Sequence, residues 1–95
     1  MELLKIIEAD YLDHYRIELT FNDGIKTIVD LKSKVFNDHR KVFEALRDLS
    51  HFKKFTKNRW TIEWANGVDL APEYLYELAG EQNKKAIRNS DTVLT

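Results

Sequence analysis

Residues 64–76 read Trp-Ala-Asn-Gly-Val-Asp-Leu-Ala-Pro-Glu-Tyr-Leu-Tyr, so that a strand end, a glycine turn and a helix start follow one another closely. Pro72 suits the first turn of a helix, where its missing N–H costs no hydrogen bond, and Glu73 suits the positive end of the helix dipole. Asp69 can close an Asx-type turn before that helix. We therefore expect a short helix over about 72–79, ended by Gly80.

The alternation of apolar and polar residues around this turn predicts its length. Apolar side chains occupy every second position from Trp60 to Trp64, which is typical of a strand with one aromatic face. A three-residue loop pairs Trp64 with Val68 and Ile62 with Leu70, and it keeps the apolar positions on one face. The sequence therefore predicts a hairpin here.

A similar device occurs earlier in the chain, around Gly24. Apolar residues alternate over 15–21 and again over 25–31. A three-residue loop brings the two apolar sets onto one face and sets Arg16 opposite Asp30 on the other, a favourable cross-strand pair. Gly24 is then expected in the left-handed conformation of a turn followed by a bulge. An additional strand is expected over about 3–11.

The pattern changes to a helical period after residue 37. Val42, Phe43, Leu46 and Leu49 share one face of a helix, which predicts an amphipathic helix over about 38–50 with Asn37 or Asp38 as its N-cap. The lysine-rich segment between residues 52 and 55 is expected to form a short edge strand, and Lys57-Asn58 a turn.

Taken together, the elements predict an α+β fold with antiparallel hairpins, one amphipathic helix and a short C-terminal helix. Residues 1–79 are expected to form a single domain. Residues 80–95 are polar, and we expect a C-terminal tail that is flexible or ordered by a partner.

The order of these motifs resembles a bacterial family known as domain of unknown function 2442. The resemblance covers about residues 3–79 and is carried by the hairpin that returns through 29–31, by the Leu46–Phe52 spacing, and above all by Trp-x-Asn-Gly-x-Asp-Leu-x-Pro-Glu at 64–73. Members often have proline where this chain has Ala65. The resemblance implies a small α+β domain; some relatives are fused to a helix-turn-helix segment, and some are encoded beside a small partner as a toxin–antitoxin pair.

Composition narrows the class of protein. The chain has 95 residues, a hydrophobic fraction of 43%, a net charge of −1 and no cysteine, which excludes disulfides and thiolate metal sites. It also has no apolar run of the roughly 18–20 residues that a membrane helix needs. A cytoplasmic protein that does not act at a membrane is expected.

Nothing in the sequence predicts catalysis. The three histidines are scattered without metal-ligand spacing, the serines lack a nucleophile motif, and the glycines form no phosphate-binding loop. We therefore expect no catalytic residue, no metal and no cofactor, and we keep an enzyme of unknown class as the less favoured interpretation.

The charges are strongly segregated along the chain. Residues 39–59 carry seven bases and two acids, a net charge of +5, and residues 60–81 carry five acids and no base, a net charge of −5. These segments suit a charge-complementary contact with another small protein or a second copy, unless they neutralise each other within one molecule. The candidate partner-binding residues are Arg40, Lys53, Lys54, Lys57, Arg59, Trp64, Asp69, Tyr74 and Tyr76.

The favoured function is thus a non-catalytic protein-interaction or regulatory module. The alternative is a nucleic-acid-associated regulator that uses the basic segment 39–59, in which aromatic residues are interleaved with lysines. The tryptophans at 60 and 64 have two interpretations as well, an exposed aromatic anchor or a pair of core residues.

Overall fold

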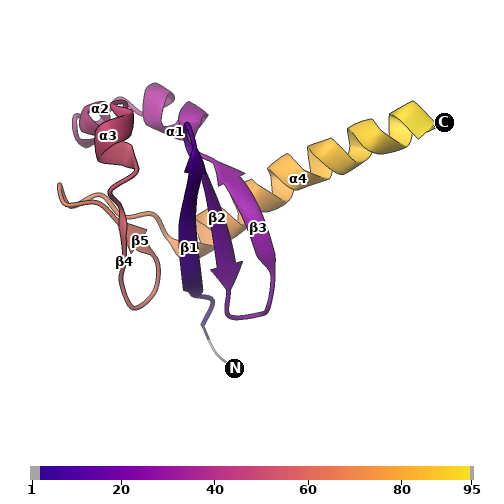
Figure 1. Ribbon diagram of the computed structural model, residues 1–95, viewed down its shortest axis with the longest axis horizontal. Helices are drawn as coiled ribbons and strands as arrows, with labels where there is room; N and C mark the ends of the chain where they lie inside the picture. The colour runs from indigo at the N-terminus through magenta and orange to yellow at the C-terminus, as the bar shows by residue number, and fades with distance from the viewer. Residues whose placement is uncertain (1–2, 95) are drawn as a thin grey trace.

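A computed structural model describes the backbone over residues 3–94 and the side chains over residues 3–83. The fold is α+β, as predicted: a three-stranded antiparallel sheet stands beside a lobe of short helices with a two-stranded sheet, and a long helix crosses behind the larger sheet (Figure 1). The elements in chain order are β1 (Ile6–Asp13), β2 (Arg16–Phe21), β3 (Lys26–Asp30), α1 (Lys32–Asn37), α2 (Val42–Leu46), α3 (Leu49–Phe52), β4 (Thr56–Lys57), β5 (Ile62–Glu63) and α4 (Pro72–Leu94).

The β2–β3 hairpin has the predicted register. Arg16 lies opposite Asp30, and the amide of Phe21 donates to the carbonyl of Ile25 at 2.9 Å. Gly24 has a φ of 90°, which confirms the three-residue loop. The cross-strand placement of Arg16 and Asp30 is therefore confirmed, while the guanidinium of Arg16 makes its two hydrogen bonds, of 2.6–2.7 Å, to the carboxylate of Asp13.

The second predicted turn also has the expected register. The amide of Trp64 donates to the carbonyl of Val68 at 2.8 Å, and Gly67 has a φ of 94°. The expected aromatic face is only partly present, since Trp64 is buried whereas Trp60 is 44% exposed. The reason is local: the side chain of Asn58 accepts hydrogen bonds from the amides of residues 60 and 61, and this turn directs Trp60 outward.

The predicted helix over 38–50 is interrupted, and a helix before it was missed. Asp38 has an extended backbone and ends α1, and Asp48 has an extended backbone and begins α3, where its carboxylate accepts from the amide of Ser50. These two aspartates therefore divide the segment into short helices around α2. Phe52 closes α3 and does not begin an edge strand. Strand β4 comes later, at Thr56–Lys57, and a turn begins at Asn58, whose amide donates to the carbonyl of Thr61 at 2.8 Å.

Helix α4 begins at Pro72 as predicted, but Gly80 does not end it. The side-chain amide of Gln82 accepts a hydrogen bond from the amide of Asp30 at 2.8 Å and donates to its carbonyl at 2.9 Å, which attaches the helix to the edge strand β3. The predicted flexible or partner-ordered tail falls mostly on residues 84–95, whose side chains lie outside the described residues. Over the part of the chain that is described, no helix combines the length and apolar character needed to cross a membrane.

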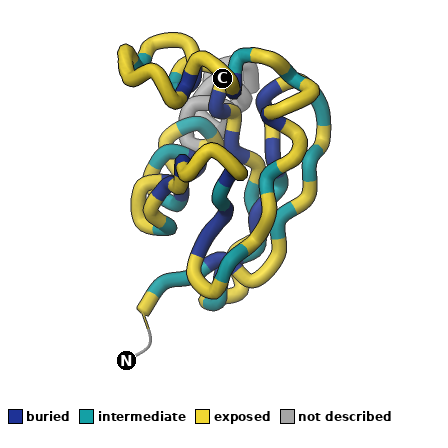
Figure 2. The backbone as a smooth tube through the Cα atoms, turned by 90° about the vertical axis from the view of Figure 1, so that its left-hand side faces the viewer, coloured by how far each residue is buried: buried dark blue, intermediate teal, exposed yellow. Residues whose placement is uncertain are grey.

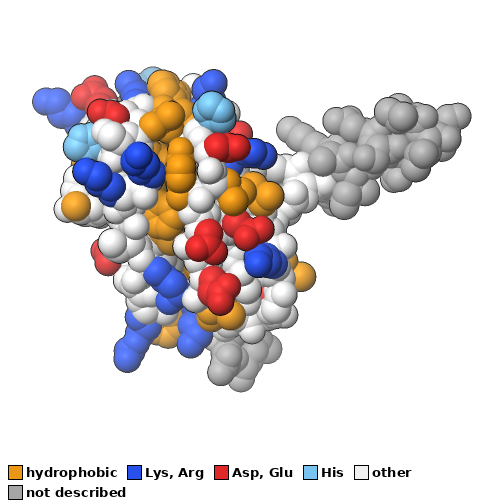
Figure 3. Space-filling model, viewed as in Figure 1, with side chains coloured by type: hydrophobic (Ala, Val, Ile, Leu, Met, Phe, Trp, Pro, Cys, Tyr) orange, Lys and Arg blue, Asp and Glu red, His pale blue; other side chains and the backbone are white. Residues whose placement is uncertain are grey.

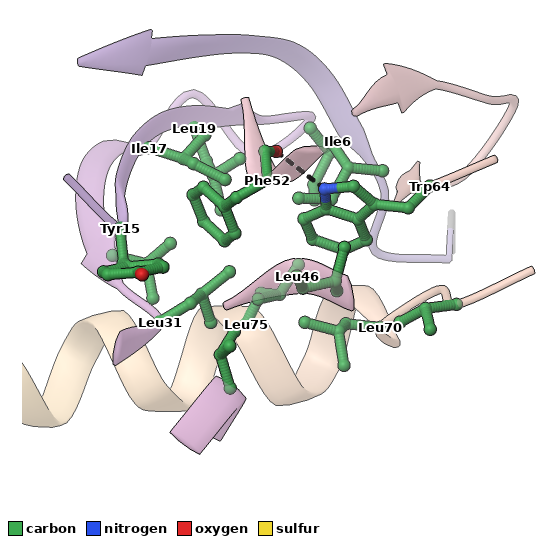
Figure 4. Close-up of a cluster of buried hydrophobic side chains, with 14 of the residues drawn as sticks. Ile6, Tyr15, Ile17, Leu19, Leu31, Leu46, Phe52, Trp64, Leu70 and Leu75 are labelled. Atoms are coloured by element: carbon green, nitrogen blue, oxygen red, sulfur yellow. Dashed lines mark hydrogen bonds between the residues drawn. The ribbon is translucent and has the colours of Figure 1, made fainter. Parts of the chain in front are cut away.

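The core lies between the sheet, the helical lobe and α4. Every second residue of β2 is buried, and β1 and β3 contribute Ile6 and Val29 (Figure 2). Phe52 lies at the centre, with its ring 5.1 Å from that of Tyr15, 5.7 Å from that of Trp64 and 6.3 Å from that of Tyr11 (Figure 4). Leu75 and Ala79 bring α4 onto the same core. One aromatic side chain therefore joins the sheet to the lobe.

The three glycines should respond to alanine in opposite directions. An added Cβ meets no atom within 4 Å at any of them, so backbone conformation alone decides the effect. Gly24→Ala and Gly67→Ala should each lower the free energy of unfolding by about 1–2 kcal/mol, because their φ is positive. Gly80→Ala should raise it by up to about 1 kcal/mol, because alanine is the better helix former. Urea denaturation checks all three, and stabilisation by Gly67→Ala would contradict the turn geometry.

Candidate functional site

The basic segment 39–59 forms the outside of the helical lobe, and we call it the basic lobe. Lys53, Lys54, Lys57 and Arg59 are all exposed. On the face shown in Figure 3, lysine and arginine side chains gather over the side of the lobe, whereas several acidic side chains gather over the sheet. Short helices and a two-stranded sheet thus keep the bases of this one segment on one side of the molecule.

The two oppositely charged segments do not neutralise each other through ion pairs. Among the side chains that the structure describes, the ion pairs join Arg16 to Asp13, Lys26 to Glu18, and both Lys34 and Arg40 to Asp38. None of them connects a base of residues 39–59 to an acid of residues 60–81. The lysines of the basic lobe therefore remain available to a charged partner.

Arg40 is one of the bases of the lobe that contacts within the protein hold in place. Its guanidinium makes two hydrogen bonds to the carboxylate of Asp38, at 2.9 and 3.0 Å, and lies over the ring of Phe43. The hydrogen bonds from the Arg40 side chain, then from Lys34 and from the Arg40 amide, pull the pKa of Asp38 far below its usual range. Arg40 thus belongs to a structural ion pair and contributes less to a free surface than the lysines.

The predicted aromatic residues differ in their accessibility. Trp64 is only 4% exposed, and its indole N–H donates to the carbonyl of Phe52 at 2.7 Å, so its prediction as a surface anchor is wrong. Tyr76 donates from its hydroxyl to the carboxylate of Asp23 at 2.8 Å. Tyr74 is exposed, with the ammonium of Lys34 5.4 Å from its ring centre.

Asp69 is exposed just after the turn at residues 65–67, which we call the motif turn. Its backbone forms an isolated antiparallel β-bridge with the backbone of Glu63. Within the described part of the chain, Thr61 is the one buried polar side chain, and its hydroxyl donates to the carbonyl of Leu70 at 2.6 Å. Among these same residues, no group of three or more histidine, aspartate or glutamate side chains is arranged so that it could hold a metal ion.

A hollow of about 250 Å³ lies between α2, α3 and the turn that follows β5. Sequence reasoning did not identify it, because its walls come from two segments that lie far apart along the chain. Asn66 joins them, since its side-chain amide donates to the carbonyl of Val42 at 2.9 Å. The lining residues are Ala45, Leu46, His51, Lys54, Trp64, Ala65 and Asn66.

The comparisons with known proteins agree with this architecture. The model of a family described as proteins of unknown function, domain of unknown function 2442, matches residues 6–81. The chain belongs to this family. The motif at 64–73 therefore identified it correctly, and the hollow is built partly from that motif. No curated protein matches the chain.

One solved structure shares the fold. It is that of a candidate DNA-binding protein of Nitrosomonas europaea, with a TM-score of 0.73 and 19% sequence identity. The match covers 86% of this chain and 52% of the other, so this chain spans about half the length of that protein. At this identity the likeness establishes the fold alone.

The ion pair at Asp38 predicts a defined dependence of stability on pH. A carboxyl whose pKa is lowered by folding stabilises the protein above its unfolded pKa of about 3.9, and this contribution is lost as the pH falls towards the folded pKa. Asp38→Asn should therefore be less stable than the parent near pH 7, and the difference should shrink steadily below about pH 4. Urea denaturation at several pH values measures it. Glu44→Gln, at an exposed acid of the same lobe that belongs to none of the described ion pairs, is the control for the loss of one negative charge.

Proposed function

We propose that this chain is a non-catalytic protein-interaction module that binds an acidic partner through the lysines of the basic lobe. The observation that carries the proposal is that these lysines are exposed and form no ion pair with the acids of residues 60–81 in the described structure. A net charge of −1 for the whole chain makes this concentration of bases a local feature and not a property of the whole surface.

The physical case rests on the set of bases and not on any one of them. A single exposed ion pair contributes about 0–1 kcal/mol, because both ions are well solvated and long side chains must be held still. Several bases on one side of a molecule act together on the association rate and on the choice of partner. A module of this kind needs a complementary acidic surface on its partner.

Two kinds of protein partner fit this chemistry. One is a small acidic protein, as in the toxin–antitoxin pairs that the family resemblance implies, acting in the cytoplasm. The other is a second copy, whose acids at 63, 69, 73 and 77 would meet the lysines of the first in a head-to-tail contact. In both cases the contact is weakened by salt.

Capture of partners from native lysate at low and high salt tests the proposal. A stoichiometric partner, or a concentration-dependent dimer by mass measurement, is expected at low salt. Lys53→Glu with Lys57→Glu should weaken that contact by about tenfold or more, since each lost pair and each new repulsion costs up to about 1 kcal/mol. The control, Lys26→Glu with Lys32→Glu, makes the same charge change away from the lobe and should bind normally. Equal losses in both variants would contradict the proposal.

A nucleic-acid-associated regulator is the second candidate, because the solved neighbour is described as a candidate DNA-binding protein. Phosphate contacts made by the lobe would give an affinity that falls steeply with salt. We expect only weak binding to DNA and RNA in a salt titration at physiological ionic strength. Tight binding that is abolished by reversing Lys53, Lys54 and Lys57 together would favour this candidate over protein binding.

A further inference from the structure

The hollow beside the motif turn has the size of a site for one side chain. Its volume is about 250 Å³, which is below the roughly 300–1,000 Å³ typical of sites for small molecules and cofactors. One leucine, methionine or phenylalanine side chain is a suitable occupant. The hollow is therefore too small for most cofactors and large enough for an anchor residue of a protein partner.

The walls of the hollow are mostly apolar. Ala45, Leu46, Trp64 and Ala65 supply them. The side chain of Asn66 is already engaged within the protein, because its nitrogen donates to a carbonyl of α2 and its oxygen accepts from the amide of residue 68 at 3.3 Å. An apolar group that enters here would not deprive the side chain of Asn66 of its hydrogen-bond partners.

The two remaining lining residues are His51 and Lys54, both of them exposed donors. Neither belongs to an ion pair over the described side chains. The carboxylate nearest to them along the chain, Asp48, accepts hydrogen bonds from the amide and hydroxyl of Ser50, which lower its pKa most, and His51 and Lys54 lower that pKa further through space without forming an ion pair. Among the described residues no carboxylate lines the hollow, so an acid beside the anchor residue would complement its rim.

The floor of the hollow is formed before any partner arrives. The indole of Trp64 is fixed by its hydrogen bond to the carbonyl of Phe52 and by contact with the ring of Phe55, whose centre is 6.1 Å away. A preformed wall avoids the entropy cost of ordering side chains on binding. This favours a specific anchor over a diffuse charge contact.

We propose that this hollow binds a single large apolar side chain from an acidic segment of a protein partner, with a carboxylate next to the anchor pairing with Lys54. The inference rests on the proposed function and specifies it: the lysines of the basic lobe attract the segment, and the hollow selects its anchor residue. His51 supplies a second donor at the rim.

A peptide titration followed by NMR tests the site. The probe is a blocked peptide of sequence Asp-Glu-Leu-Glu-Asp, added to the ¹⁵N-labelled full chain. The indole N–H of Trp64 and the amides of Ala45 and Ala65 should shift, whereas the indole N–H of Trp60, away from the hollow, should not. A peptide with alanine in place of leucine, and one with the acids replaced by their amides, should each bind roughly tenfold more weakly.

Matched variants separate the anchor from the charge. Ala45→Leu fills the hollow from an exposed position of α2 and should abolish the shifts, and Lys54→Glu should weaken binding roughly tenfold or more. Lys57→Glu makes the same charge change outside the hollow and should have a clearly smaller effect. A thermal melt of Ala45→Leu verifies that the variant is folded, and retention of the shifts in this folded variant would overturn the proposal.

The other outcomes are equally decisive. Equal affinity for the leucine and alanine peptides, or equal losses in Lys54→Glu and Lys57→Glu, would overturn the anchor site. Shifts of the same resonances with protein concentration alone would mean that a second copy occupies the hollow, and would overturn the acidic-peptide assignment. If partner capture succeeds while the peptide leaves the Trp64 resonance unchanged, the anchor site is wrong and the proposed function stands. If no partner is captured and the peptide does not bind, the anchor site and the proposed function are both wrong.

Discussion

The hydrogen bond from the indole of Trp64 to the carbonyl of Phe52 joins the turn that follows β5 to the end of α3, at the centre of the core. Phe52 is the last residue of α3, a position whose carbonyl has no partner within its own helix. If that buried carbonyl lost its donor, the cost would be about 1–3 kcal/mol. The bond therefore places the motif turn against the helical lobe, and the ring of Phe52 connects the lobe to the sheet.

The surface that we assign to partner binding depends on this arrangement. Helices of five and four residues, such as α2 and α3, are too short to be stable alone in water. Their positions are set by Phe43, Leu46 and Phe52, which are buried beneath them. The packing of these buried side chains, and not the helix propensity of the segments, therefore fixes the positions of the exposed lysines and of the hollow beside the turn. In the proposed function, a partner contacts charge and shape together there, because both belong to one packed lobe.

The accuracy of the sequence-based predictions follows the range of the interactions involved. Both hairpin registers were predicted correctly, because a period of two and a glycine that must adopt positive φ leave one consistent loop length. The helix over 38–50 was divided, because Asp38 and Asp48 prefer to cap helix ends and the helical period of the apolar residues hides this preference. Gly80 failed as a stop signal, since the contact of Gln82 with Asp30 supports α4 beyond it.

By itself the sequence determined the α+β class, the two turns, the start of α4 and the family. Each of these depends on the backbone conformation of a few neighbouring residues and on the local alternation of apolar and polar side chains. It also revealed the segregation of charge. Only the tertiary structure decided that Trp64 is buried while Trp60 is exposed, that the opposed charges of residues 39–81 form no ion pairs, and that a hollow lies beside Lys54. The physical reason is that each of these depends on how segments distant in the sequence pack, and no periodicity along the chain records that packing.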